Sequence, residues 1–294
     1  MKRRLAAGTA VSAGLVLSLT GCLGDSGGGD KAGAGAEGGK SVVLAADMMR
    51  KSSDTTSKVE TVKADVQTEV TAPGTGKTVT MHMRMDSKLR PEPAFRMTID
   101  SMNMGGTSVG GQGGMELIMV GHAVYMKSAL FAQLTHGKPW LKISSSELGA
   151  ASGQNFDQLI EQQKQADPAE QTRMFTASKD VREVGKETVN GVETTHYRGT
   201  VSLQEIEAKL PAASRPQQMK SFQKLGLQSL AFDLWVDGKQ LPAKVVVKSP
   251  EGASTKMNTT VVYSGWNTPV TVTAPPASEV GPMPKLPSLG APGA

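Results

Sequence analysis

The sequence predicts an α+β fold, in which a single large, curved, mostly antiparallel sheet of about ten or eleven strands carries helices against one face. Apolar and polar residues alternate along most segments between residues 59 and 263, as is typical of strands that bury one face. Turn signals separate these segments, and Asn190-Gly191 is the strongest of them because this pair favours a tight hairpin. Helix-type stretches interrupt the strands at residues 146–178 and 202–225, so helices and strands belong to one domain.

The first half begins with a helix expected over residues 41–53, where apolar residues recur at helical spacing. Six strand segments are expected to follow, at residues 59–71, 78–86, 95–99, 115–120, 123–127 and 140–144. Alternation is cleanest at 78–86, where Val79, Met81 and Met83 share one face. Pro73-Gly74-Thr75-Gly76 predicts a turn, and the glycine-rich residues 105–114 predict a long, mobile hairpin loop.

The second half begins with a helix, because Asp167-Pro168-Ala169-Glu170 combines a capping Asp with a Pro at the first helical position. Ser202 and Glu205 form a capping box that predicts a second helix start. A further helix is expected over residues 216–225. The expected strands are residues 180–189, 192–202, 229–236, 242–248 and 254–263.

The N-terminus predicts a lipoprotein signal. Lys2, Arg3 and Arg4 precede an apolar run over residues 5–19 that is short for a membrane span. Leu19-Thr20-Gly21-Cys22 then resembles the bacterial lipobox, in which a lipid is joined to the Cys sulfur and the chain is cut just before it. An ordinary secretory signal followed by an unrelated Cys is the alternative. Cys22 is the only Cys in the chain, so lipidation would also remove the free thiol of a secreted protein.

Composition limits the other classes of function. Loss of the three N-terminal cations leaves 29 Lys and Arg against 27 Asp and Glu, and with three Trp, three Tyr and six Phe the chain offers no basic, aromatic surface for nucleic acid. The expected organisation is a signal peptide (1–21), the lipidated Cys with a Gly-rich flexible tether (22–40), a large domain (41–274) and a tail rich in Pro, Gly and Ala that we expect to be irregular (275–294).

Four groups of segments resemble the LppX/LprG-type lipoproteins of actinobacteria, which are similar to the LolA family of lipoprotein carriers. They are residues 124–127 (VYMK) with 138–142 (KPWLK), 189–197 (VNGVETTHY), 234–237 (LWVD) with 241–244 (LPAK), and 263–270 (YSGWNTPV) continuing to Ala274-Pro275. The resemblance covers about residues 41–280. It implies a half-barrel with helices over its concave face and, between them, an apolar cavity that holds the acyl chains of a lipid or glycolipid.

Sixteen Met residues against six Phe are the most unusual internal feature. Flexible, polarizable thioethers suit an apolar surface that repacks around different ligands, and a solid core that uses Met is the alternative. The residues expected to line the cavity are the apolar residues that alternate with polar ones along each strand segment. They are Val79, Met81, Met83, Phe95, Met97, Ile99, Leu117, Met119, Leu230, Phe232, Leu234, Val245 and Val247.

The expected function is therefore an envelope lipoprotein, held at the outer face of the cell membrane by diacylglyceryl and acyl chains on Cys22, that binds a lipid or amphipathic ligand without a cofactor. A protein-interaction lipoprotein with a filled core, whose partner the sequence does not name, is the first alternative. A copper lipoprotein is the second, because thioethers around residues 81–85 are soft ligands, although His82 is expected on the opposite face.

The sequence does not predict an enzyme. Gly106-Thr107-Ser108-Val109-Gly110 matches a nucleophile elbow, but more glycine follows it where a helix is needed. The four His residues lack zinc-type spacing, and His196 is expected to be a structural hydrogen-bonding residue.

Overall fold

A computed structural model describes residues 35–74, 76–108, 114–121, 123–129, 135, 137–144, 167–210, 212 and 215–281. The predicted signal peptide, Cys22 and the first part of the tether lie outside these residues. So do the center of the predicted 105–114 loop, most of the helical block predicted from residue 146, and the last part of the tail.

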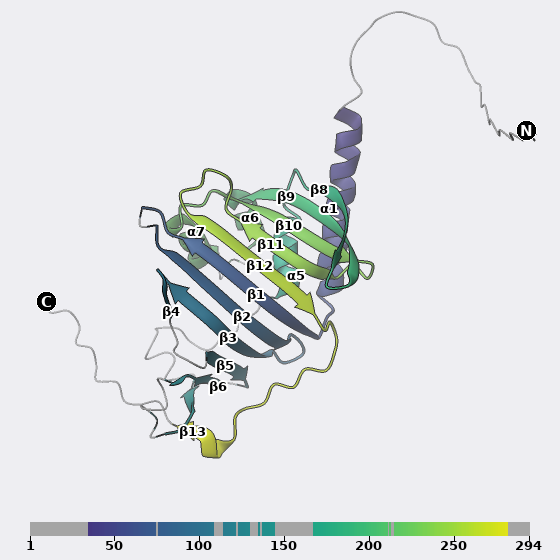
Figure 1. Ribbon diagram of the computed structural model, residues 1–294. Helices are drawn as coiled ribbons and strands as arrows, with labels where there is room; N and C mark the ends of the chain where they lie inside the picture. The colour runs from purple at the N-terminus through teal and green to yellow at the C-terminus, as the bar shows by residue number, and fades with distance from the viewer. Residues whose placement is uncertain are drawn as a thin grey trace, which may run out of the picture.

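The described strands form one sheet, and the predicted α+β class with a single curved sheet is confirmed (Figure 1). From one edge to the other its strands are β13 (Val280–Gly281), β7 (Trp140–Ser144), β6 (Ala123–Lys127), β5 (Met115–Val120), β3 (Ala94–Met104), β2 (Thr78–Lys88), β1 (Thr61–Thr71), β12 (Lys256–Ser264), β11 (Pro242–Lys248), β10 (Ser229–Asp237), β9 (Val192–Ser202) and β8 (Arg182–Val189). A two-residue strand, β4 (Thr107–Ser108), pairs with β3. All pairs are antiparallel except β13 with β7.

The sheet has thirteen strands among the described residues, more than expected. The additional strands are short and have no alternation to reveal them. β13 lies in the segment expected to be an irregular tail, where Val280 and Gly281 pair with Trp140 and Leu141 of β7. The tail is therefore part of the sheet at this point.

Helices cover one side of the sheet, behind it in Figure 1. They are α1 (Gly35–Thr56), α5 (Pro168–Phe175), α6 (Leu203–Lys209) and α7 (Arg215–Lys224). Two predicted starts are confirmed: Asp167 caps α5 with Pro168 at the first helical position, and Ser202 and Glu205 form the capping box of α6.

α1 begins six residues before the predicted helix, inside the segment expected to be a flexible tether. Its C-terminal part packs on the domain through Ala45 and Met49, which are 2% and 0% exposed. Once this part is helical, each residue added at the N-terminus gains a backbone hydrogen bond without a new nucleation cost, so the helix continues back to Gly35.

Candidate functional site

Strand register places apolar side chains on one side of the sheet, which we call the inner face because the helices cover it. Val66 pairs with Met83 and Met83 with Ile99. Further along the sheet Met97 pairs with Leu117. Since directly paired residues point to the same side, the apolar surface is continuous from β7 to β9.

All thirteen residues predicted to line a cavity lie on this inner face. These thirteen residues differ in how deeply they are buried. Leu230, Phe232, Leu234, Val245, Phe95 and Met119 are buried; Val247, Met97 and Leu117 pack against buried residues while staying half-buried; and Val79, Met81, Met83 and Ile99 are half-buried.

The described residues form two packed groups on the inner face. The large cluster joins β9–β12 and β1 to the helices, and its center is the stack of Phe175 on Phe232, with ring centroids 4.3 Å apart. The small cluster is Phe95, Met119, Val124, Leu141 and Ile143. Met85 packs against both groups.

A third part of the inner face, which we call the methionine strip, belongs to neither cluster. It consists of Val79, Met81 and Met83 on β2, Ile99, Met102 and Met104 on β3, and Met115 on β5. All are half-buried except Met104, which is 50% exposed. Among the described residues, the strip is thus a region of the inner face where apolar side chains stay partly accessible outside both clusters.

A β-bulge brings two residues to this strip that strict alternation assigns to the other side. The register between β2 and β3 shifts after His82, so that His82 faces Ser101 while Met83 faces Ile99. Asp100 is the extra residue, and the shift turns Met102 and Met104 toward the inner face. Strict alternation from Phe95 places Met102 and Met104 on the other side of the sheet. For this reason neither residue was predicted to line the cavity.

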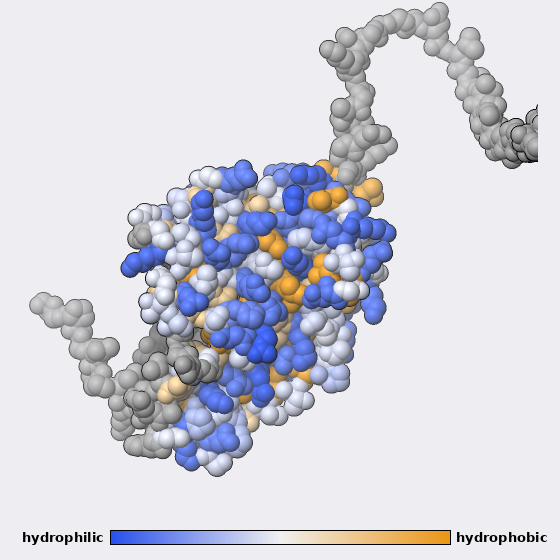
Figure 2. Space-filling model, in the orientation of Figure 1, coloured by the Kyte–Doolittle hydropathy of each residue, from blue (hydrophilic) through white to orange (hydrophobic). Residues whose placement is uncertain are grey.

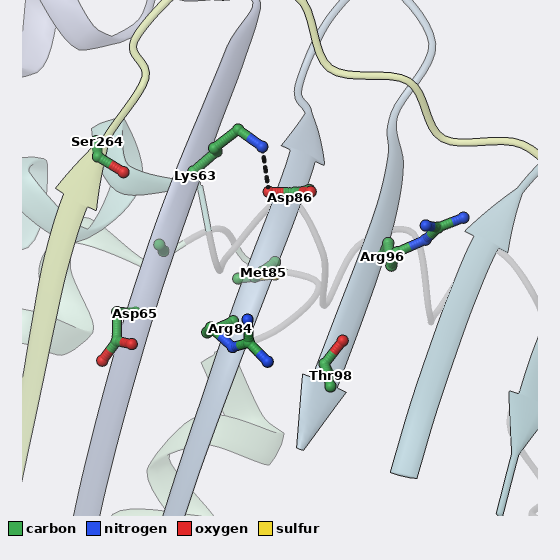
Figure 3. Close-up of a pocket in the computed structure, with 9 residues that line it drawn as sticks. Lys63, Asp65, Arg84, Met85, Asp86, Arg96, Thr98 and Ser264 are labelled. Carbon is green, nitrogen blue, oxygen red and sulfur yellow. Dashed lines mark hydrogen bonds and ion pairs between the residues drawn. The ribbon is translucent and has the colours of Figure 1, made fainter. Parts of the chain in front are cut away.

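The other side of the sheet, the outer face, points toward the viewer in Figures 1 and 2 and is mostly hydrophilic. It carries a shallow depression of about 330 Å³ over β1–β3, lined by Lys63, Ala64, Asp65, Arg84, Met85, Asp86, Arg96, Thr98 and Ser264 (Figure 3). Its cations are paired there: Lys63 Nζ lies 3.0 Å from Asp86, and Arg84 binds Asp100 through two hydrogen bonds of 2.8 and 2.5 Å. The depression is therefore a self-neutralised polar surface.

His82 lies on this outer face, as predicted, with Nε2 2.9 Å from Asp65 Oδ2. It is thus separated by the sheet from Met81 and Met83. Among the described residues no group of three or more His, Cys, Asp or Glu side chains could hold a metal ion. In this described part of the chain the thioethers therefore have no imidazole partner on their side of β2.

His196 has the structural role expected from sequence. It is 3% exposed, with Nε2 and Nδ1 each 2.8 Å from a carboxylate, Asp233 and Glu187 respectively. Its ring stacks on Trp235 at 4.2 Å, and the Trp235 indole donates to Glu187. Hydrogen bonds from Trp235 and His196 hold the pKa of Glu187 below its usual value. The cluster fastens the β8–β9 hairpin to β10.

In the described part of the chain, helices are too short or too polar to cross a membrane.

The family model described as "Family of unknown function (DUF6612)" matches residues 44–274. A Streptomyces griseus protein described as an uncharacterized 31.2 kDa protein in the rplA-rplJ intergenic region is 30% identical over 168 residues, covering 53% of this chain and 54% of that protein. A Streptomyces coelicolor protein, SCO4650, whose name describes it as a candidate lipoprotein, is 25% identical over 159 residues, covering 53% of this chain and 46% of its own length. The chain thus spans about half the length of the curated relatives it matches.

Solved structures of similar fold include LprF from Mycobacterium bovis, with a TM-score of 0.50 and 14% identity over 79% of this chain and 97% of LprF. The Mycobacterium tuberculosis lipoprotein LppX gives a TM-score of 0.45 and 18% identity over 79% of this chain and 99% of LppX. The similarity to LprF confirms the predicted LppX/LprG-type fold.

Proposed function

This chain belongs to DUF6612, a family of unknown function, and from this family's fold and the accessible apolar strip of its sheet we propose that it is a membrane-anchored envelope lipoprotein that binds the acyl chain of a lipid or other amphipathic ligand. Acyl chains on Cys22 would hold it at the outer face of the cell membrane. Two or more chains anchor stably where one is marginal, so a diacylated Cys22 favours a stationary acceptor, chaperone or sensor over a free shuttle.

The observation that carries this proposal is the methionine strip. Its side chains share a face with two packed clusters, yet remain half-buried, and Met104 is 50% exposed. Contiguous apolar side chains that stay partly accessible are typical of a surface that a ligand or partner covers. Thioethers adjust to acyl chains of different shape at little cost.

The strip suits an acyl chain energetically. Each buried methylene contributes about 0.8 kcal/mol, so burial of about ten methylenes stabilises the complex by roughly 8 kcal/mol before the cost of association. The outer-face depression suits this ligand less, because its charged groups would lose solvation against an acyl chain.

The first test is direct. Residues 35–294, which lack Cys22 and contain all described residues, are purified without detergent, extracted with organic solvent and weighed by native mass spectrometry. We expect extra mass that disappears on extraction, or stoichiometric uptake of an added fatty acid or phospholipid. An unmodified native mass, an empty extract and no uptake would refute lipid binding and favour the protein-interaction alternative. Stoichiometric copper would instead support the metal alternative.

The second test locates the site. Met83→Gln keeps side-chain length but places an amide on the strip, and burial of an unpaired amide costs about 1–3 kcal/mol. We therefore expect affinity for a fluorescent fatty acid to fall about tenfold. Thr80→Gln is the matched control, because Thr80 lies on the outer face of the same strand. Equal affinities for the two variants would place the ligand elsewhere.

A further inference from the structure

The N-terminal part of α1 exposes two large apolar side chains. Val43 is 60% exposed and Leu44 is 66% exposed. The buried face of the helix starts with the next residue, Ala45, and continues through Met49 and Thr56, both 0% exposed. Among the side chains of α1 that the structure describes, full burial against the domain begins at Ala45.

The preceding part of the helix projects from the fold. Residues 35–44 correspond to about 15 Å of helix, and Figure 1 shows this end of α1 pointing away from the sheet. Figure 2 shows hydrophobic side chains gathered where the chain leaves the domain. Val43 and Leu44 thus directly precede the part of α1 that is buried against the domain.

The same side of the helix carries both cations and carboxylates. Arg50 and Lys51 follow Val43 and Leu44 by seven residues each, which is about two helical turns, and both are exposed. Arg50 forms an ion pair with Asp47. Asp47 and Asp54 lie on this side as well, so its charge is balanced. The exposed apolar pair, and not charge, is the feature that suits a membrane interface.

The length of the chain identifies the occupant of this surface. Residues 23–34 connect Cys22 to α1, and even fully extended they span at most about 45 Å. An anchor on Cys22 therefore keeps the first residue of α1 within about 45 Å of the membrane. We propose that Val43 and Leu44 insert into the membrane interface, so that the domain docks by the N-terminal half of α1. This inference rests on the proposed lipidation of Cys22.

The test uses the full lipidated chain in vesicles of phosphatidylcholine and phosphatidylglycerol. With Cys22 occupied, Leu44→Cys introduces the single free thiol, which takes a polarity-sensitive fluorophore. Val192→Cys is the control, because Val192 is 45% exposed on β9. We expect brominated lipids to quench the label at position 44 at least twofold and its emission to shift to the blue, with no change for the label at position 192.

Flotation with the vesicles separates the two hypotheses. If the chain floats and the two labels respond alike, docking through α1 is refuted while anchoring stands. If the chain does not float, the anchoring proposal fails and docking fails with it. A second variant, Val43→Ser with Leu44→Ser, labelled at residue 40 through Lys40→Cys, should lose at least half of the quenching seen with the native pair. Unchanged quenching would also refute the inference.

Discussion

Gly199 on β9 offers a sharp test of how the large cluster is packed. A Cβ at this position would lie 2.8 Å from Cζ of Phe232 and 2.7 Å from Oγ of Ser178. The Phe232 ring has little room to move away from the added methyl group, because Phe232 is 1% exposed and stacks on Phe175. Oγ of Ser178 is held by Asp180 at 2.8 Å. The substitution Gly199→Ala therefore forces the aromatic stack apart.

The magnitude follows from two opposing effects. Overpacking a filled core costs about 1–3 kcal/mol, whereas replacing a strand glycine gains roughly 0.5–1 kcal/mol from the lower entropy of the unfolded chain. We expect the overpacking to dominate at Gly199, with a net loss of about 1–2 kcal/mol. For a domain of this size such a loss lowers Tm by about 2–8 °C.

The assay is urea unfolding followed by circular dichroism, with the substitution made in the native chain and again with Phe232→Leu. Leucine removes the ring atoms that clash but leaves the contact with Ser178. In that background Gly199→Ala should therefore cost less than in the native chain, and the difference is the coupling energy of a double-mutant cycle. An unchanged midpoint in the native chain, or an equal cost in both backgrounds, would refute the reasoning.

Three further predictions concern single groups. Burial is the strongest single influence and raises the pKa of Asp233, but the hydrogen bonds from Arg198 and His196 and the charges of Arg198 and Lys248 together outweigh it, so the pKa is lowered. This stabilisation is present above the unfolded pKa, near 4, and is lost as pH falls through the lower folded value. Asp233→Asn should therefore cost about 2 kcal/mol at pH 7 and flatten the acid limb of a stability–pH curve. Burial raises the pKa of Tyr263. Its contribution to the free energy of unfolding is therefore present below the unfolded pKa of about 10 and is lost as pH rises above that value. Tyr263→Phe should weaken alkaline unfolding, and an identical alkaline limb of the stability–pH curve would contradict this. Ser202→Ala removes the acceptor of the Glu205 backbone N–H and should lower the free energy of unfolding by about 1 kcal/mol, measured with urea; no change would mean that the cap contributes nothing.

Local signals in the sequence predicted the parts of the fold that depend on neighbouring residues. Asn190 and Gly191 adopt positive φ angles of 49° and 81°, as the hairpin turn requires. The capping residues at Asp167 and Ser202 define helix starts in the structure as they did in the sequence. These features depend on contacts within a few residues, so no knowledge of the tertiary structure was needed.

Features that depend on contacts between residues far apart in the sequence were harder to predict. The inward direction of Met102 and Met104 follows from the bulge at Asp100, and no pattern within β3 marks it. Similarly, alternation identifies Phe232 and Met83 equally as inner-face residues, yet one is 1% exposed and the other half-buried. The difference arises because α5 covers Phe232 through Phe175, and helix placement is a tertiary property.

If acyl chains on Cys22 hold the protein at a membrane, as we propose, the two edges of the sheet have a consequence for neighbouring copies. Open strand edges invite pairing between neighbouring copies. At one edge, the two-residue strand β13 pairs with β7 and covers its side. A Cβ added at Gly281 of β13 would lie 2.7 Å from Thr135, so the chain is closely packed there. At the opposite edge, a bulge between Glu183 and Gly185 interrupts β8, which also carries the exposed charge of Lys186. Crowded copies would therefore meet at edges that resist strand addition, so dense packing on a membrane need not become aggregation.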